Sequence, residues 1–150
     1  MKRTSYAGMP CPMAQTLERV GEWWSLLILR ECFRGTRRFG EFERRLGIAK
    51  NVLSSRLKRL VEAGILARRP SPEDAREVEY RLTAAGKDLL PVLVALAQWG
   101  DRWVYGGRAP SRFVNRHTGA PVQTLAVRDV DGQVLAARDL ALHPPDADRA

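Results

Sequence analysis

The chain has 150 residues, of which 45% are hydrophobic, and its formal net charge at pH 7 is +8. This length suits one domain of ordinary size with an appendage. No segment approaches the roughly 18 consecutive apolar residues that a membrane-spanning helix needs, and the basic N-terminus has no apolar core of the kind found in signal peptides. We therefore expect a cytoplasmic protein that does not enter a membrane.

The excess positive charge is concentrated in one stretch. Between Arg34 and Arg69 the sequence has eleven Lys or Arg residues and three acidic residues, a difference equal to the excess of the whole chain. Net charge alone indicates nonspecific attraction to polyanions rather than a fold. A clustered basic footprint is nevertheless what a nucleic-acid-binding protein needs.

The first segment, residues 1–10, is polar and is expected to form a flexible arm. Pro is favoured at the first position of a helix, so Pro12 predicts a helix over residues 12–20 with Cys11 as its cap. A second helix over residues 23–34 is apolar nearly all round, which predicts a buried central helix containing Cys32. The inward-facing residues of the first helix are expected to be Ala14, Leu17 and Val20.

Two short helices joined by a tight turn come next and predict a helix-turn-helix. The first, residues 39–46, has apolar residues at helical spacing, and Gly47 follows where a left-handed C-terminal cap is expected. The second begins near Lys50 and ends at Gly64. Its apolar residues recur at intervals of three and four and predict a stripe that faces the core. This stripe comprises Leu53, Leu57, Leu60 and Val61.

The other face of the second helix carries side chains suited to a major groove. Asn can pair with adenine, Arg with guanine and Ser with either base. An ordinary solvated face is the alternative. Val52 lies off the core stripe, so it either touches a thymine methyl group or is half-buried at the start of the helix. The groove-facing and flanking residues in this prediction are Lys50, Asn51, Ser54, Ser55, Arg56 and Arg59.

Cations on both sides of the helix-turn-helix are candidate backbone contacts. Arg37 and Arg38 precede it and are expected to reach phosphates, with solvated loop cations as the alternative. Residues 65–69 and 78–82 predict two strands, and a hairpin directly after a recognition helix is a wing. At its tip, Arg76 is expected to contact a minor groove or a phosphate strand, although Glu73 and Asp74 oppose it.

Thr83 is a good N-cap for a long helix over residues 84–105, in which Pro91 should produce a kink. One small domain cannot bury the wide apolar surface of this helix. A partner helix from a second subunit would bury it, and such a homodimer would match pseudo-palindromic DNA.

The composition changes after residue 105. Residues 122–130 and 133–142 alternate weakly around Asp131 and Gly132, which is a strong turn signal and predicts a β-hairpin. Residues 143–150 are expected to form a disordered tail. The domain division predicted from these changes is an arm over residues 1–10, a DNA-binding domain over 11–105 and an extension over 106–150.

The order of these elements, together with short motifs, resembles the HxlR-type transcriptional regulators, which are winged helix-turn-helix proteins related to the MarR group. The resemblance covers roughly residues 11–104 and implies a mainly α, α+β winged helix with a long dimerisation helix. It also implies a DNA-binding homodimer that represses or activates nearby genes. The matching motifs are Cys11-Pro12, Leu26-Leu27-Ile28-Leu29-Arg30, Arg38-Phe39, Leu53-Ser54-Ser55-Arg56-Leu57-Lys58 and Val78-Glu79-Tyr80-Arg81-Leu82-Thr83.

The chain also departs from the family pattern. Ala49 stands where the family usually has Ser, which removes a helix cap worth about 1 kcal/mol. Longer relatives build a zinc knuckle from Cys pairs in their extension, whereas this extension has His117 and no Cys. A tetrahedral site needs about four N or S ligands, so we expect no zinc and no other metal or cofactor.

Cys11 resembles a cysteine that senses electrophiles or oxidants in some relatives. A helix N-terminus lowers the pKa of a thiol and makes the thiolate more available. The alternative is a capping residue with no signalling role. A small-molecule or oxidant effector is compatible with the sequence, but nothing in the pattern demands one.

We therefore expect a transcriptional regulator that binds specific double-stranded DNA as a homodimer. The alternative is a winged-helix protein-interaction module without specific DNA binding. An enzyme is not expected, because the only histidines, His117 and His143, lie in the extension and no nucleophile–base or P-loop pattern is present.

Overall fold

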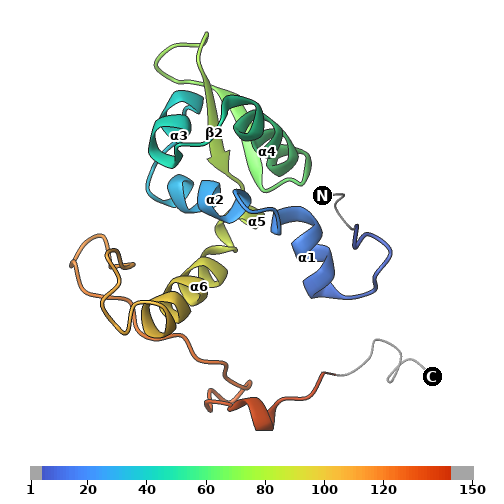
Figure 1. Cartoon of the computed structure of the whole chain (residues 1–150), viewed down its shortest axis with the longest axis vertical. Helices are drawn as coiled ribbons and strands as arrows, with labels where there is room; N and C mark the ends of the chain where they lie inside the picture. The colour runs from blue at the N-terminus through green and yellow to red at the C-terminus, as the bar shows by residue number, and fades with distance from the viewer. Residues whose placement is uncertain (1–4, 143–150) are drawn as a thin grey trace. The chain divides into compact units, whose positions relative to one another are not determined.

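The computed structural model describes residues 5–142, so the expected disordered tail lies outside the described residues. The chain divides into two compact units, Met1–Leu90 and Pro91–Ala150. In chain order the elements are α1 (Pro12–Val20), α2 (Ser25–Phe33), α3 (Phe39–Leu46), α4 (Lys50–Glu62), β1 (Leu66–Pro70), β2 (Val78–Leu82), α5 (Ala84–Lys87), α6 (Leu90–Trp103) and the 3₁₀ turn η1 (Ala137–Asp139) (Figure 1). This is the predicted α+β winged helix.

The core of the first unit is built on the apolar stripe of α4. Leu53, Leu57 and Leu60 are fully buried, as predicted, whereas Val61 is only half-buried. Helices α2 and α3 pack against α4 and supply further large buried side chains. The side chains from these neighbours are Ile28, Leu29 and Phe42.

Two residues of the predicted buried helices are exposed: Leu17 of α1, and Trp23, which the helix predicted over residues 23–34 included but which lies before α2 begins at Ser25. Trp23 is 91% exposed and Leu17 is 45% exposed, while Ala14 and Val20 are buried as predicted. Apolar character on all sides of a helix does not show which side its own domain covers. Large exposed apolar side chains instead mark surfaces that are available to a partner.

The wing is a two-stranded antiparallel sheet in which Leu66 lies opposite Leu82 and Pro70 opposite Val78. The first strand begins one residue later than predicted. Thr83 ends the sheet and caps α5, because its hydroxyl accepts a hydrogen bond from the Gly86 amide at 3.1 Å.

The predicted long helix over residues 84–105 is instead two helices, α5 and α6. Pro91 therefore lies in the first turn of α6 and does not kink a continuous helix. A proline has no N–H to donate and disfavours helical backbone in the residue before it, so a helix begins at Pro more readily than it runs through it.

The predicted strands over residues 122–130 and 133–142 do not form. A single bridge joins Arg128 to Val134 around the expected turn, where Gly132 has a φ of 85°. Both segments are largely exposed, so they have no buried apolar face to stabilise a sheet. The Gln98 side chain binds this segment instead: it donates to the Gln123 carbonyl at 2.9 Å and accepts from the Leu125 amide at 2.8 Å.

Residues 5–10, expected to form a flexible arm, are hydrogen-bonded to α1. The side-chain amide of Gln15 donates to three carbonyls of this segment, and the Tyr6 amide donates to the Glu18 carboxylate at 2.9 Å.

Gly86 allows α5 to pack closely against the turn between α4 and β1. A Cβ atom at this position would lie 2.3 Å from the Ile65 carbonyl oxygen, which is closer than real contacts allow. We expect Gly86→Ala to lower the free energy of unfolding by about 1–3 kcal/mol, because backbone must move. Gly40→Ala is the matched control, since Gly40 is also helical and has nothing within 4 Å of the added Cβ.

Gly40→Ala should change stability by less than about 1 kcal/mol, in the stabilising direction. Urea unfolding followed by circular dichroism measures both variants. Equal effects of the two substitutions would contradict the close approach at Gly86.

Candidate nucleic-acid interface

The exposed face of α4 begins immediately after the turn of the helix-turn-helix. Gly47 closes α3 in the left-handed conformation with a φ of 63°, as predicted. Ala49 then precedes α4 and no side chain caps its first turn. The first amides of α4 are therefore available to an anion or to water, an arrangement that suits a phosphate oxygen.

The short polar side chains predicted to read bases lie together on the N-terminal half of α4. Asn51, Ser54 and Ser55 are exposed, as is Lys50, whose ammonium group is 3.9 Å from Glu43. Val52 is half-buried. This half of α4 therefore presents hydrogen-bonding groups that base edges in a major groove can use.

Arg56 and Arg59 are placed differently from the residues at the start of α4. Both guanidinium groups form ion pairs with the carboxylate of Glu22, which lies between α1 and α2. The Arg56 side chain is only 24% exposed and that of Glu22 only 15% exposed. The two arginines predicted to contact DNA are therefore paired with a carboxylate of the protein itself.

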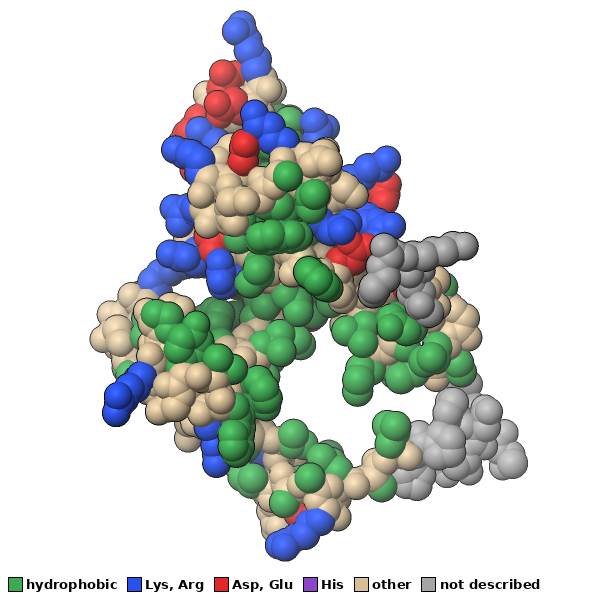
Figure 2. Space-filling view, viewed as in Figure 1, with side chains coloured by type: hydrophobic (Ala, Val, Ile, Leu, Met, Phe, Trp, Pro, Cys, Tyr) green, Lys and Arg blue, Asp and Glu red, His purple; other side chains and the backbone are tan. Residues whose placement is uncertain are grey.

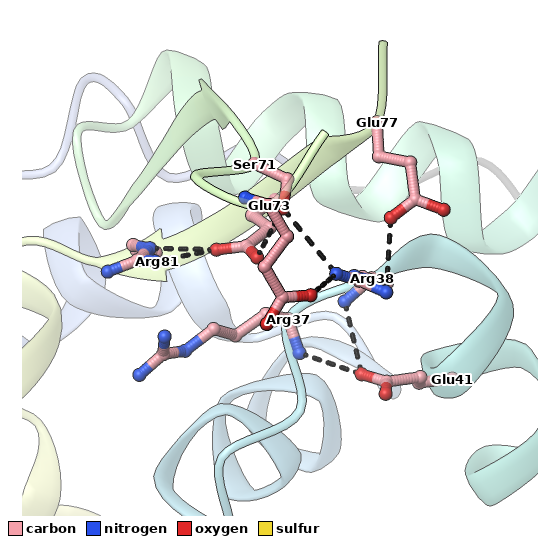
Figure 3. A network of polar contacts seen from close by, with 8 residues as sticks. Arg37, Arg38, Glu41, Ser71, Glu73, Glu77 and Arg81 are labelled. Atoms are coloured by element: carbon pink, nitrogen blue, oxygen red, sulfur yellow. Dashed lines mark hydrogen bonds and ion pairs between the residues drawn. The ribbon is translucent and has the colours of Figure 1, made fainter. Parts of the chain in front are cut away.

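Arg37 and Arg38 are adjacent in sequence but have different surroundings (Figure 3). Their backbone amides both donate to the Glu41 carboxylate at 3.3 Å, and these bonds lower the pKa of Glu41. The Arg38 guanidinium pairs with Glu73 at 2.6 Å and with Glu77 at 3.1 Å. The Arg37 side chain is exposed and forms no ion pair within the described part of the chain.

Strand β2 of the wing contains a buried carboxylate close to the tip loop. Glu79 is 5% exposed; the Arg81 guanidinium donates to it at 2.8 Å and the Ser71 hydroxyl at 3.1 Å. The bond from Arg81 is the main reason that the pKa of Glu79 is lowered. At the tip, the Arg76 amide donates to Asp74 at 2.9 Å, and the Arg76 side chain is exposed.

A second buried carboxylate, Glu31, was also not predicted from the sequence. The side chain of Glu31, in α2, is 1% exposed and lies 2.9 Å from Arg30, 3.3 Å from Arg34 and 3.8 Å from Arg45 of α3. A lone acid within an otherwise apolar helix was the available signal, because a buried charge needs a partner. Glu31 therefore pairs with three of the basic residues and links α2 to the last turn of α3.

The two cysteines have different environments. Cys11 is the N-cap residue of α1, as predicted, but its side chain makes no capping hydrogen bond. Burial raises the pKa of the Cys32 thiol to about 12, and the neighbouring Glu31 carboxylate acts in the same direction. Cys32 is therefore a protonated thiol at neutral pH.

Basic side chains are spread over the part of the molecule that contains α3, α4 and the wing, with acidic side chains among them (Figure 2). Among residues 5–142, no helix is both long enough and apolar enough to cross a membrane.

A family model, the HxlR-like helix-turn-helix, matches residues 19–107. A protein named as an HTH-type transcriptional regulator, Rv3095 of Mycobacterium tuberculosis, is 43% identical over 133 residues, which is 88% of this chain and 84% of that protein. The crystal structure of PA1607, whose name describes a candidate transcription factor, is 43% identical, with a TM-score of 0.87 over 93% of this chain and 99% of that one.

The redox regulator HypR in its reduced form is also similar. It is 29% identical, with a TM-score of 0.55 over 65% of this chain and 100% of that one. The similar proteins are thus regulators rather than enzymes, and the family model covers the helix-turn-helix, the wing and α6. The chain is a transcriptional regulator that belongs to the HxlR-like helix-turn-helix family.

Proposed function

We propose that this regulator binds a specific double-stranded DNA operator as a homodimer in the cytoplasm. The observation that carries the proposal is the exposed polar face of α4, where Asn51, Ser54 and Ser55 stand beside Lys50 at the start of the helix. In this proposal these residues enter the major groove, because a recognition helix reads base edges with its N-terminal residues.

Phosphate contacts are assigned to cations on either side of that helix. Arg37 and Arg76 have exposed side chains and flank the groove-reading residues from the loop before α3 and from the wing tip. Arg56 and Arg59 form ion pairs with Glu22 in the free protein. To contact a phosphate, each would replace its ion pair with Glu22 by an ion pair with DNA. Arg38 is also paired in the free protein, with Glu73 and Glu77 of the wing, and is not assigned a phosphate contact. Phosphate contacts of this kind set register and affinity, whereas base contacts set specificity.

Dimerisation is proposed through α6, which presents an apolar stripe to solvent. Val92, Leu96, Trp99 and Trp103 are spaced by four, three and four residues and are 42%, 52%, 62% and 65% exposed. Residues at this spacing lie on one helix face. A second copy of the same helix would remove this stripe from water, and the resulting two-fold symmetry matches a pseudo-palindromic operator.

The proposed binding to a specific operator can be tested directly. The purified protein should bind its own upstream DNA more tightly than a scrambled duplex, measured by fluorescence anisotropy at several salt concentrations. Asn51→Ala should lose about 1–3 kcal/mol of discrimination at one base pair, whereas Arg37→Ala should lower the salt slope by about one and leave base preference unchanged. Equal binding to both duplexes would leave only the electrostatic attraction and favour the protein-interaction module.

The proposed dimer interface on α6 can be tested by substitution within its apolar stripe. Leu96→Asp should shift the molar mass measured by light scattering from dimer to monomer, because a buried carboxylate without a partner opposes association. Val130→Asp is the matched control, since Val130 is 101% exposed in the C-terminal turn and lies outside the stripe. A dimer that persists in Leu96→Asp would place the interface elsewhere.

We further propose Cys11 as a sensor of oxidants. Cys11 lies at the start of α1 and its side chain is partly exposed, and the similar HypR is named a redox regulator. Diamide should weaken DNA binding of the wild type and of the control Cys32→Ser, but not of Cys11→Ser. Full sensitivity of Cys11→Ser to diamide would leave Cys11 as a residue at a helix start with no signalling role.

A further inference from the structure

The tip of the wing carries more negative than positive charge. Residues 71–77 include Glu73, Asp74 and Glu77 against the single cation Arg76. Three carboxylates beside a DNA backbone would repel its phosphates. A wing tip of this composition needs a counter-charge from outside the tip if it is to approach DNA.

That counter-charge is Arg38, which lies at the N-cap position of α3 and not in the wing. Its guanidinium lies 2.6 Å from Glu73 and 3.1 Å from Glu77, and it approaches the Ser71 hydroxyl at 3.5 Å (Figure 3). Arg38 therefore contacts both ends of the loop at the wing tip. Because the guanidinium is a planar fork with five donors, one Arg can hold several acceptors in a fixed arrangement.

Arg38 is one end of a continuous polar network that reaches strand β2 of the wing. Ser71 is 4% exposed; its hydroxyl donates to Glu79 at 3.1 Å and accepts from the Glu73 amide at 3.3 Å. Glu79 in turn accepts from Arg81. Backbone hydrogen bonds join the same segments. The Tyr80 amide donates to the Arg37 carbonyl at 2.8 Å, and the Ser71 amide donates to the Glu77 carbonyl at 2.8 Å.

We infer that Arg38 is a positioning residue for DNA recognition: it neutralises Glu73 and Glu77 and fixes the wing tip against α3, so that Arg76 is presented to DNA. This inference rests on the proposed DNA-binding function. It assigns to Arg38 a role different from that of its neighbour Arg37, although a sequence pattern cannot separate the two.

The exposure of these groups decides which quantity Arg38 should affect. The side chains of Arg38, Glu73 and Glu77 are 36%, 81% and 48% exposed, and ion pairs this accessible to water add little to global stability. We therefore expect the urea midpoint to change little when Arg38 is replaced. The order of the wing and the electrostatic field that it presents to DNA should change instead.

The experiment is a double-mutant cycle in the full-length chain. Arg38→Gln, Glu73→Gln with Glu77→Gln, and the triple variant are compared for binding to the upstream DNA. Arg38→Gln alone should weaken binding about five- to tenfold, because it frees two carboxylates beside DNA. In the background that lacks both carboxylates, the same substitution should cost less than about twofold, since interacting groups are not additive. A direct phosphate contact would instead cost the same in both backgrounds and would overturn the inference.

Hydrogen exchange of the Ser71 and Tyr80 amides provides a readout that does not depend on DNA. Arg38→Gln should accelerate exchange of these amides, because the tip loses its attachment to α3. Arg37→Gln is the matched control: it removes the same charge one residue away and should leave exchange of the Ser71 amide unchanged. Its cost in DNA binding should be the same with and without the wing carboxylates.

The outcomes separate this inference from the proposed function. If the wild type does not distinguish operator from scrambled DNA, specific binding fails, while the exchange rates still decide whether Arg38 positions the wing. Unchanged exchange in Arg38→Gln overturns the inference even if operator binding is specific. Should Arg38→Gln not fold, the Glu73→Gln and Glu77→Gln variant must itself accelerate exchange of Ser71 and Tyr80, and failure to do so is equally decisive.

Discussion

The burial of one helix face is the constraint on which the rest of this structure depends. Leu53, Leu57 and Leu60 are removed from water beneath α2 and α3, which orients α4 about its own axis. Replacing any one of them by Ala would leave a cavity that costs about 2–5 kcal/mol. Because residues on a helix have fixed angular spacing, burying this stripe leaves Asn51 and Ser55 on the solvent side. The recognition surface is thus a consequence of the core.

The basic residues around that core fall into two groups. Some are already paired in the free protein: Glu22 holds two cations of α4, and Glu31 collects Arg30, Arg34 and Arg45. Others, such as Arg37 and Arg76, have side chains that face water. The total charge attracts a polyanion in either case. The distinction matters because only an unpaired cation can neutralise a phosphate without first breaking a contact within the protein.

Where structure and expectation differ, neighbours that are distant in sequence supply the reason. Trp23 and Leu17 look like core residues in the sequence, but in the structure Trp23 is 91% exposed and Leu17 is 45% exposed. The segments around Asp131 and Gly132 have the right turn, yet without a buried face they form one bridge and no strands. The acids of the wing tip appeared to weaken the case for DNA contact at Arg76. The pairing of Glu73 and Glu77 with Arg38 shows that part of this negative charge is compensated within the protein.

The sequence by itself determined the helix-turn-helix, the wing and the face of α4 that points outward, since periodicity, capping residues and turn residues act over a few positions. It also determined the family, through motifs spread along residues 11–104. Only the tertiary structure decided which cations are free, because ion pairs such as Arg56 with Glu22 and Arg38 with Glu73 join residues more than thirty positions apart. Such pairs depend on how helices and the wing pack, and no local pattern encodes that distance.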